Sequence, residues 1–302
     1  MSHQDTSIKS ILFALSANLG IAITKTVAAV ITGSGAMLAE SIHSYADCGN
    51  QGLLFWGLKA TNKKPNPEHP LGYGKEIYFW SFIVALILFS MGGLFSVYEG
   101  IHKIHLHEGL KNPIIAIVVL SVSMIFEGAS LYGCLTQINK IRHNESLWSW
   151  YRNSRQSELV IVLGEDIAAL LGLSFALISL ILSIATGNPV FDAIGSIGIG
   201  TLLIFISILL AIKVKGLLIG QSVDDETRSK IQTFLEARPE IERIFNLITI
   251  QLGPQILVAV KAKMKKTSSV DQLIENINNC ESELRKENLT IQWIFFEPDV
   301  KD

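Results

Sequence analysis

The chain has 302 residues, of which 49% are hydrophobic and 17% are charged, whereas soluble domains usually carry about 25% charged residues. The formal net charge of −2 gives no basis for a nucleic-acid partner. Its three cysteines, Cys48, Cys134 and Cys280, are too few and too scattered for a disulfide framework. The composition therefore indicates a membrane protein, and the large share of the charged residues after residue 219 indicates a soluble domain that follows the membrane part.

Apolar runs of membrane length occupy most of the first two thirds of the chain. About 20 apolar residues span a bilayer. Six runs qualify, at residues 9–31, 35–58, 78–101, 113–136, 158–184 and 190–214. The polar start lacks the basic segment and cleavage site of a signal peptide, so the first run is expected to stay in the mature protein. We predict a six-helix transmembrane domain over residues 1–218.

Basic residues near the ends of these runs are unequally distributed, which predicts the orientation. One side carries only Lys103 and Lys111. The other side carries Lys59, Lys63, Lys64, Lys75, Lys140, Arg142, Arg152, Arg155, Lys213 and Lys215. We therefore expect a multi-pass protein of the inner cell membrane, with both termini and the long polar loops at 59–77 and 137–157 in the cytoplasm.

The last part of the chain, residues 219–302, has the pattern of a small α+β domain. Ser222 with three following acidic residues, and Ser269 with Gln272, predict two capped helices. The expected order is helix, strand, strand, helix and strand, at residues 222–237, 247–252, 256–264, 270–286 and 291–296. This αββαβ order predicts a two-layer domain with the helices on one face of a small sheet.

Ionisable side chains within the apolar runs are functional candidates, because burying a charge in a bilayer is costly. The polar residues are Glu40, His43, Asp47, Asn50 and Gln51 in the second run, Glu127 in the fourth, and Glu165 and Asp166 in the fifth. Those of the second run fall within roughly a 100° arc of one helix face. At about 1.5 Å per residue, Asp47, Glu127 and Asp166 reach similar depths in the bilayer. We expect four carboxylates and one imidazole to converge near the midplane.

Such a group of side chains suits a divalent cation. An imidazole with carboxylates is a suitable first shell for Zn²⁺, and His43 and Asp47 are spaced i, i+4 on one side of a helix. Ligands must lose their protons to bind metal, so metal and protons compete for the same groups. A site of this kind that opens alternately to each face of the membrane is an antiporter.

Other interpretations stay open for several polar residues. Glu40 and Lys25 lie at similar depths and are also suited to a structural ion pair, and Glu127 beside Gly128 is also suited to a helix crossing. Cys48 points about 100° away from Asp47, which favours packing over metal binding. Three histidines in an outer loop either sample metal or have no role: His102, His105 and His107.

Three separated motifs resemble the cation diffusion facilitator family over nearly the whole chain. They are residues 18–50, with Thr-Gly-Ser at 32–34 and Ala-Glu-Ser-Ile-His-Ser-Tyr-Ala-Asp at 39–47, then His-Pro-Leu-Gly-Tyr-Gly-Lys-Glu at 69–76, and Phe-Phe-Glu-Pro at 295–298. The resemblance implies a homodimeric zinc/proton antiporter with six helices per protomer and a metallochaperone-like cytoplasmic domain. In that family one ligand pair is His-or-Asp-x-x-x-Asp, which corresponds to His43 and Asp47, and the other is His-x-x-x-Asp, which corresponds to Val162 and Asp166.

Val162 departs from the family pattern, because valine cannot bind metal. Glu165 lies within about 60° of Val162 around the helix and is placed to supply the missing ligand. Gly164-Glu165-Asp166 and Phe126-Glu127-Gly128 resemble the branch that includes the animal mitochondrial zinc exporters. The predicted metal site is His43, Asp47 and Asp166, completed by Glu165, Glu127 or water. Its oxygen-rich shell would lower the preference for Zn²⁺ over Mn²⁺, Fe²⁺ or Co²⁺.

The C-terminal segment and the long loop at 59–77 also depart from the family pattern. The segment has no histidine and Cys280 is its only thiol, so we expect a dimer clamp without metal control. Tyr73 stands where a second histidine often occurs, so a metal site at His69, even with help from Glu68, would be weak, and we favour a structural role for this loop.

These observations predict a secondary transporter that moves Zn²⁺ out of the cytoplasm in exchange for protons. Export of Mn²⁺, Fe²⁺ or Co²⁺ by the same mechanism is the alternative, and a metal-binding channel or receptor is the rival of another class. No His-Glu-x-x-His or nucleophile–base pair suggests a hydrolase, and no catalytic cofactor is expected. The expected partners are the metal ion, protons, membrane lipid and a second copy of the chain.

Overall fold

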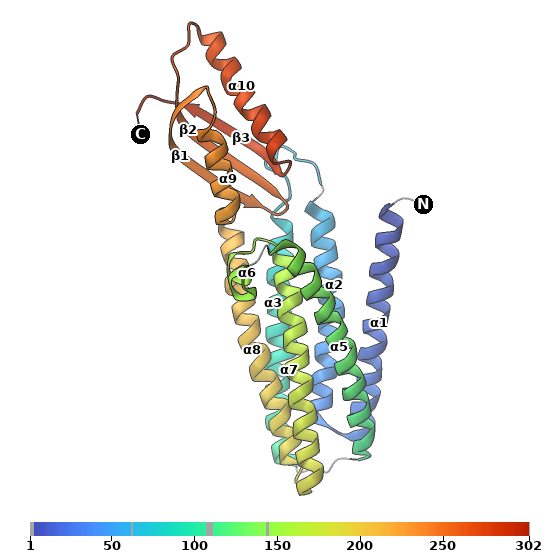
Figure 1. Ribbon diagram of the computed structural model, residues 1–302. Coiled ribbons are helices and arrows are strands. Elements are labelled where there is room, and N and C mark those ends of the chain that lie inside the picture. Colours follow the sequence, from blue (N-terminus) through green and yellow to red (C-terminus); the bar gives the residue numbers. More distant parts are fainter. Residues whose placement is uncertain (1–2, 62, 107–110, 143–144, 302) are drawn as a thin grey trace. The chain divides into compact units, whose positions relative to one another are not determined.

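The computed structural model describes residues 3–61, 63–106, 111–142 and 145–301. The chain forms two compact units (Figure 1). The first, here called the helical unit, comprises Met1–Trp56, Trp80–Glu145 and Glu158–Val214. The second, here called the sheet unit, comprises Gly57–Phe79, Ser146–Ser157 and Lys215–Asp302, so the C-terminal segment packs with two segments of the long loops. The assignment of transport to residues 1–218 and dimerisation to 219–302 stays a prediction.

Helices cover all six predicted apolar runs in the described part of the chain. They are α1 (His3–Thr32), α2 (Gly35–Thr61), the third helix composed of α3 (Glu76–Ile87), the π-helical segment η1 (Leu88–Leu94) and α4 (Phe95–Leu106), then α5 (Pro113–Ile141), α7 (Ser157–Thr186) and α8 (Val190–Ile219). Each extends beyond the predicted run by a few residues, because a helix continues past the apolar core into the polar flanks.

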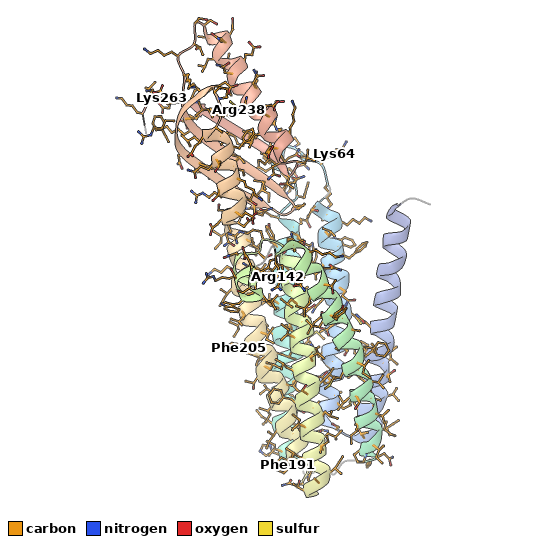
Figure 2. All side chains as sticks on the ribbon, viewed as in Figure 1. Lys64, Arg142, Phe191, Phe205, Arg238 and Lys263 are labelled. Carbon is orange, nitrogen blue, oxygen red and sulfur yellow. The ribbon has the colours of Figure 1, made fainter. Side chains whose placement is uncertain are left out.

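Four helices among the described residues are long and apolar enough to cross a membrane: Glu76–His105, Pro113–Ile141, Ser157–Thr186 and Val190–Ile219. Large apolar side chains are exposed on their outer faces, as Figure 2 shows for Phe205, which is 60% exposed on α8. Surfaces of this kind suit lipid rather than water. The side chains that the structure describes in α1 begin at Asn18 and are mainly apolar up to Thr32. Helix α2 carries the polar face noted above. The membrane crossing of these two helices stays a prediction.

Glycines allow the third helix to approach α8 very closely. A Cβ atom on Gly93 would lie 2.5 Å from Ile204, and one on Gly100 would lie 2.8 Å from the carbonyl oxygen of Ala193. A Cβ atom on Gly200, in α8, would lie 2.6 Å from the carbonyl oxygen of Gly93. Small residues of this kind let helix backbones pack together inside a membrane.

A buried carboxylate from α8 caps the N-terminus of α2. Asp192 accepts hydrogen bonds from the Ser34 hydroxyl (2.5 Å) and the Gly35 amide (2.6 Å). Lys103, at the end of α4, lies 3.9 Å from Asp192 and donates to the carbonyl of Gly33. Negative charge at a helix N-terminus is stabilising, because the first amides lack partners within the helix. The cap therefore joins α2, α4 and α8 at one end of the helical unit.

The C-terminal part of the sheet unit has the predicted element order: α9 (Asp225–Glu236), β1 (Ile241–Leu252), β2 (Gln255–Met264), α10 (Val270–Glu287) and β3 (Ile291–Pro298). The strands lie in the order β1-β2-β3, with β1 antiparallel and β3 parallel to β2. Both helices contribute to one apolar core with the sheet, which includes Ile231, Leu235, Val258, Cys280 and Leu284.

Three details of the C-terminal segment differ from the sequence prediction. Strand β1 begins at Ile241 rather than at residue 247, because irregular pairing between Ile241 and Asn246 breaks the alternation that marks a strand. Asp224, not Ser222, caps α9 and accepts from the Thr227 amide at 2.8 Å, while the Ser222 hydroxyl pairs with Thr249. Ser269 caps α10 as predicted, although the Gln272 side chain accepts from Ser268.

The loop before α7 contains a short helix that the sequence did not predict, α6 (Leu147–Asn153), capped by Ser146. After it, Arg155 donates to the carbonyl oxygens of Ser222 (2.6 Å), Val223 and Asn153. Burial lowers the pKa of the Arg155 guanidinium from its usual value, although the nearby Asp224 and Asp225 carboxylates act in the opposite direction. Arg155 thereby fastens this loop to the chain that leads into α9.

The other loop packs on the β1–β2 turn. Gly253, at φ +64°, forms this turn and donates its amide to the Tyr78 hydroxyl at 3.0 Å. A Cβ atom on Gly74 would collide with the carbonyl oxygen of Leu252, so only glycine fits there. His69 stacks on Tyr73 at 4.4 Å between ring centroids. These contacts support the structural role favoured for the loop motif.

Gly74→Ala should destabilise the sheet unit by about 1–3 kcal/mol, because the added methyl group meets a backbone atom that cannot easily move. Thermal unfolding and limited proteolysis within residues 63–75 would measure the effect. Lys64→Ala, at an exposed position of the same loop, is the control and should behave as the unmodified protein does. Equal stability of the two variants would show that the close contact at Gly74 is not maintained in solution.

Candidate metal centre

The helical unit contains a cavity of about 130 Å³ whose wall comes from four helices. Its lining residues are Asn18 and Ile21 of α1, Ser44, Asp47 and Gln51 of α2, Phe126, Glu127 and Ser130 of α5, and Val162, Glu165 and Asp166 of α7. Their convergence follows from helical periodicity, because the 3- and 4-residue spacings on α2, α5 and α7 each place the polar side chains on one face. A polar cavity thus lies within an otherwise apolar bundle.

Four of the five predicted site residues line this cavity: Asp47, Glu127, Glu165 and Asp166. The fifth, His43, lies one turn before Asp47 on α2, is fully buried, and is not part of the described cavity lining. Its Nδ1 atom is 3.6 Å from Asp47 Oδ1, which is too long for a hydrogen bond. The imidazole is therefore beside the carboxylate group without being bonded to it.

Several buried polar atoms at this place have no hydrogen-bond partner. They are both ring nitrogens of His43, Oδ1 of Asp47, Oδ1 of Asn50 and Oδ2 of Asp166. Buried polar groups in folded proteins are nearly always hydrogen-bonded, and each exception calls for an explanation such as a bound ion or water. The oxygens, and one ring nitrogen of a neutral imidazole, are lone-pair donors of the kind that Zn²⁺ accepts, so the donor set fits a cation.

Two neighbouring polar residues orient the carboxylates of α7. Asn50 donates to Glu165 Oε1 at 2.6 Å, and Ser130 donates to Asp166 Oδ1 at 3.1 Å. Hydrogen bonds of this kind fix the direction of a metal-ligating carboxylate. Ser130 is not among the residues singled out from the sequence, although it follows Glu127 by three residues and so shares its helix face.

The candidate ligands line a cavity, and their side chains do not converge on one ion position. Among the side chains that the structure describes, which begin at Asn18, no three of His, Cys, Asp or Glu lie close enough together to hold one metal ion. Val162 lines the cavity beside Glu165 and Asp166, so the departure from the family pattern lies inside the site. What the cavity wall offers to a cation is mainly oxygen.

The remaining polar candidates occupy different places. Lys25 and Glu40 form the ion pair considered above, with 3.3 Å between Lys25 Nζ and Glu40 Oε2. His102 stacks on Tyr98, and His105 lies within hydrogen-bond distance of the Ile101 carbonyl oxygen. His107 lies outside the described residues.

Apolar helices of membrane length around an internal cavity rich in carboxylates define a membrane protein that handles cations. A model of the cation efflux transmembrane domain matches residues 11–219. The chain therefore belongs to the cation diffusion facilitator family, which is a family of transporters rather than enzymes.

Three relatives illustrate this membership. The chain is 34% identical to metal tolerance protein C4 of Arabidopsis thaliana over 225 residues, and this aligned region covers 73% of the chain and 49% of the relative. It is 33% identical to the mitochondrial proton-coupled zinc antiporter SLC30A9 of Homo sapiens over 234 residues, and the aligned region covers 76% of the chain and 41% of the relative. It is 24% identical to magnetosome protein MamB of Magnetospirillum gryphiswaldense over 264 residues, and the aligned region covers 86% of the chain and 83% of the relative. The chain thus matches less than half of the length of the first two.

Water access to the cavity can be tested with Ser130→Cys in a background in which Cys48, Cys134 and Cys280 are replaced by alanine. Ser130 is exposed at the cavity, whereas Ser123, two turns earlier on α5, is buried. A charged thiol reagent should modify the Ser130→Cys variant at least about tenfold faster than Ser123→Cys, because the reacting thiolate needs water. Mass spectrometry would follow the reaction in purified protein. Equal rates would mean that the cavity is closed to water.

Proposed function

We propose that this chain exports a divalent metal cation, with Zn²⁺ as the first choice, in exchange for protons by alternating access at the cavity. The observation that carries the proposal is the set of carboxylates from α2, α5 and α7 around one cavity, with buried lone pairs that have no partner. Carboxylates and imidazole bind either protons or metal, so each cation that enters displaces protons. A site that is fully protonated or fully metal-bound avoids burying unbalanced charge.

The proposed ligands are His43, Asp47 and Asp166, completed by Glu165, Glu127 or water. Since these groups surround a space, a cation has to draw them together, and the movement of α2 relative to α7 is the closing step. Asn50 and Ser130 keep two of the carboxylates aimed at the cavity while the site is empty. Weak preorganisation of this kind suits a transporter, which must release its cargo as well as bind it.

Zinc is favoured by the name of the human relative, a proton-coupled zinc antiporter. Val162 favours a second candidate, export of Mn²⁺, Fe²⁺ or Co²⁺ by the same mechanism. Because valine replaces the expected imidazole, the shell is richer in oxygen, which lowers the preference for Zn²⁺ over these ions.

The proposal includes six membrane spans with both termini in the cytoplasm, in an inner cell membrane. Helices α1 and α2 have 30 and 27 residues, which at about 1.5 Å per residue is enough to cross the hydrocarbon core. The polar face of α2 lines the cavity, so its low hydropathy does not conflict with a span. The human relative is named as mitochondrial, so the particular membrane is part of the proposal.

We also propose that the chain works as a homodimer that pairs through its sheet. Ile248, Ala259 and Phe295 are direct register partners across β1, β2 and β3, so they share one sheet face. Ile248 is 50% exposed and Phe295 54% exposed. An exposed apolar row of this kind is typical of an interaction surface, and a second copy would cover it.

Purified protein in liposomes should take up or release Zn²⁺ at a rate that rises with an opposing pH gradient. Asp47→Ala and Asp166→Ala should each lower this flux by at least about a hundredfold, because each removes a charged ligand of the proposed metal site. Lys64→Ala, outside the helical unit, is the control. Zn²⁺ flux that ignores the pH gradient would favour a channel, and normal flux in both aspartate variants would disprove the site.

Val162→His should shift selectivity toward Zn²⁺ over Mn²⁺ by about tenfold in competition assays, since imidazole favours Zn²⁺. Val162→Leu alters the same position without adding a ligand and should leave the selectivity unchanged. In the same assay, Glu165→Gln and Glu127→Gln identify the fourth ligand. Removing the charge of the residue that binds the metal lowers the affinity of the protein for Zn²⁺, whereas the other substitution does not. An unchanged selectivity in Val162→His would place residue 162 outside the metal shell.

A further inference from the structure

A second buried polar cluster lies beyond the cavity on the same face of α2. Glu40 is seven residues before Asp47, which places it about 10 Å nearer to the N-terminal end of α2. It is completely buried, and its Oε1 atom has no hydrogen-bond partner. His43 lies between Glu40 and Asp47 and is likewise buried with both ring nitrogens unpartnered. Lone pairs therefore continue from the cavity along one face of α2.

The neighbouring helix α7 leaves room for this carboxylate. A Cβ atom on Gly172 would lie 2.5 Å from Glu40 Oε1, so the glycine accommodates the unpartnered oxygen. Gly172 is six residues after Asp166, which is about 9 Å along α7. From Asp47 to Glu40 along α2, and from Asp166 to Gly172 along α7, the chain runs from the cavity toward the same end of the helical unit. Glu40 therefore lies between α2 and α7, about two helical turns from the cavity carboxylates.

Lys25 of α1 supplies the positive charge at this level. Its side chain is 1% exposed, lies 3.3 Å from Glu40 Oε2 and donates to the Ser44 hydroxyl at 2.8 Å. Ser44 also lines the cavity. The ammonium group thus has a second partner that it can keep when it separates from Glu40. An ion pair that serves stability alone would leave unexplained the unpartnered Oε1 atom and the unpartnered His43 next to it.

We infer that Glu40, with His43, forms a second cation-binding site, here called the station. The transported divalent ion passes through it between the cavity and the α1–α2 turn. Lys25 is the tethered cation that pairs with Glu40 when the ion has left. The inference rests on the proposed function and deepens it. A divalent ion that reaches Glu40 displaces the ammonium, which stays on Ser44. The return of the ammonium to Glu40 then expels the ion and prevents it from moving back toward Asp47.

The paired variant Lys25→Met with Glu40→Gln tests the station without leaving a buried charge unpaired. Removing both partners of a buried ion pair is often neutral for stability, so a purely structural pair predicts normal transport. A station predicts that Zn²⁺ flux in liposomes falls at least about tenfold, because glutamine lacks the negative charge that would bind the ion at this level. Equilibrium Zn²⁺ binding by the purified protein should stay unchanged, since the cavity ligands are intact.

Gly172→Ala is the second variant, because it displaces the Glu40 carboxylate without changing any charge. It should lower the flux while Zn²⁺ binding and the folded state are retained, and it decides the question if the paired variant does not fold. Gly133→Ala is the matched control, since a Cβ atom at that helical glycine meets nothing within 4 Å. Flux should be normal in the control.

The outcomes separate the inference from the proposed function. Normal flux in the paired variant, or in Gly172→Ala, would overturn the second station, and so would an equal loss of flux in Gly133→Ala. Loss of equilibrium Zn²⁺ binding together with flux would assign Glu40 to the central site instead. Unmodified protein that moves no Zn²⁺, Mn²⁺, Fe²⁺ or Co²⁺ would contradict the proposed function itself.

Discussion

The energetic cost of burying carboxylates in an apolar bundle is the constraint on which the rest of the helical unit depends. Each buried acid has to be compensated, and the structure does so in three ways. Asp192 caps the N-terminus of α2, and Glu40 pairs with Lys25. Asp47, Glu165 and Asp166 instead face a common cavity, where water, protons or a cation can balance their charge. The third arrangement leaves charge compensation entirely to a mobile partner, and that property is what the proposed transport site requires.

The same constraint explains why the candidate ligands surround a cavity rather than a preformed metal shell. Four carboxylates held at bonding distance from one point would repel each other whenever no cation was present. Hydrogen bonds from Asn50 to Glu165 and from Ser130 to Asp166 hold two of them apart and aimed inward. The cavity therefore fits a cycle in which the ion assembles its own shell and leaves it again when the helices separate.

The sheet unit shows how loops between membrane helices become part of a folded body. Gly74 and Tyr78 pack on the β1–β2 turn, and Arg155 binds the carbonyls that precede α9. These contacts are made by backbone atoms, one phenol hydroxyl and one guanidinium group, without a metal ligand. They leave uncovered an apolar row on the sheet, at Ile248, Ala259 and Phe295, which is the surface of the proposed homodimer.

Hydropathy and periodicity alone determined the helices, the polar face of α2 and the order of elements in the C-terminal segment, because these are properties of neighbouring residues. They also predicted that Asp47, Glu127, Glu165 and Asp166 come together, as they do at one cavity, since depth follows from the rise per residue. Only the tertiary structure decided the partners across the bundle: Ser130 on Asp166, Asn50 on Glu165 and Gly172 against Glu40. The physical reason is that these pairs are 36, 115 and 132 residues apart, and their contact depends on helix rotation and packing, which no local pattern encodes.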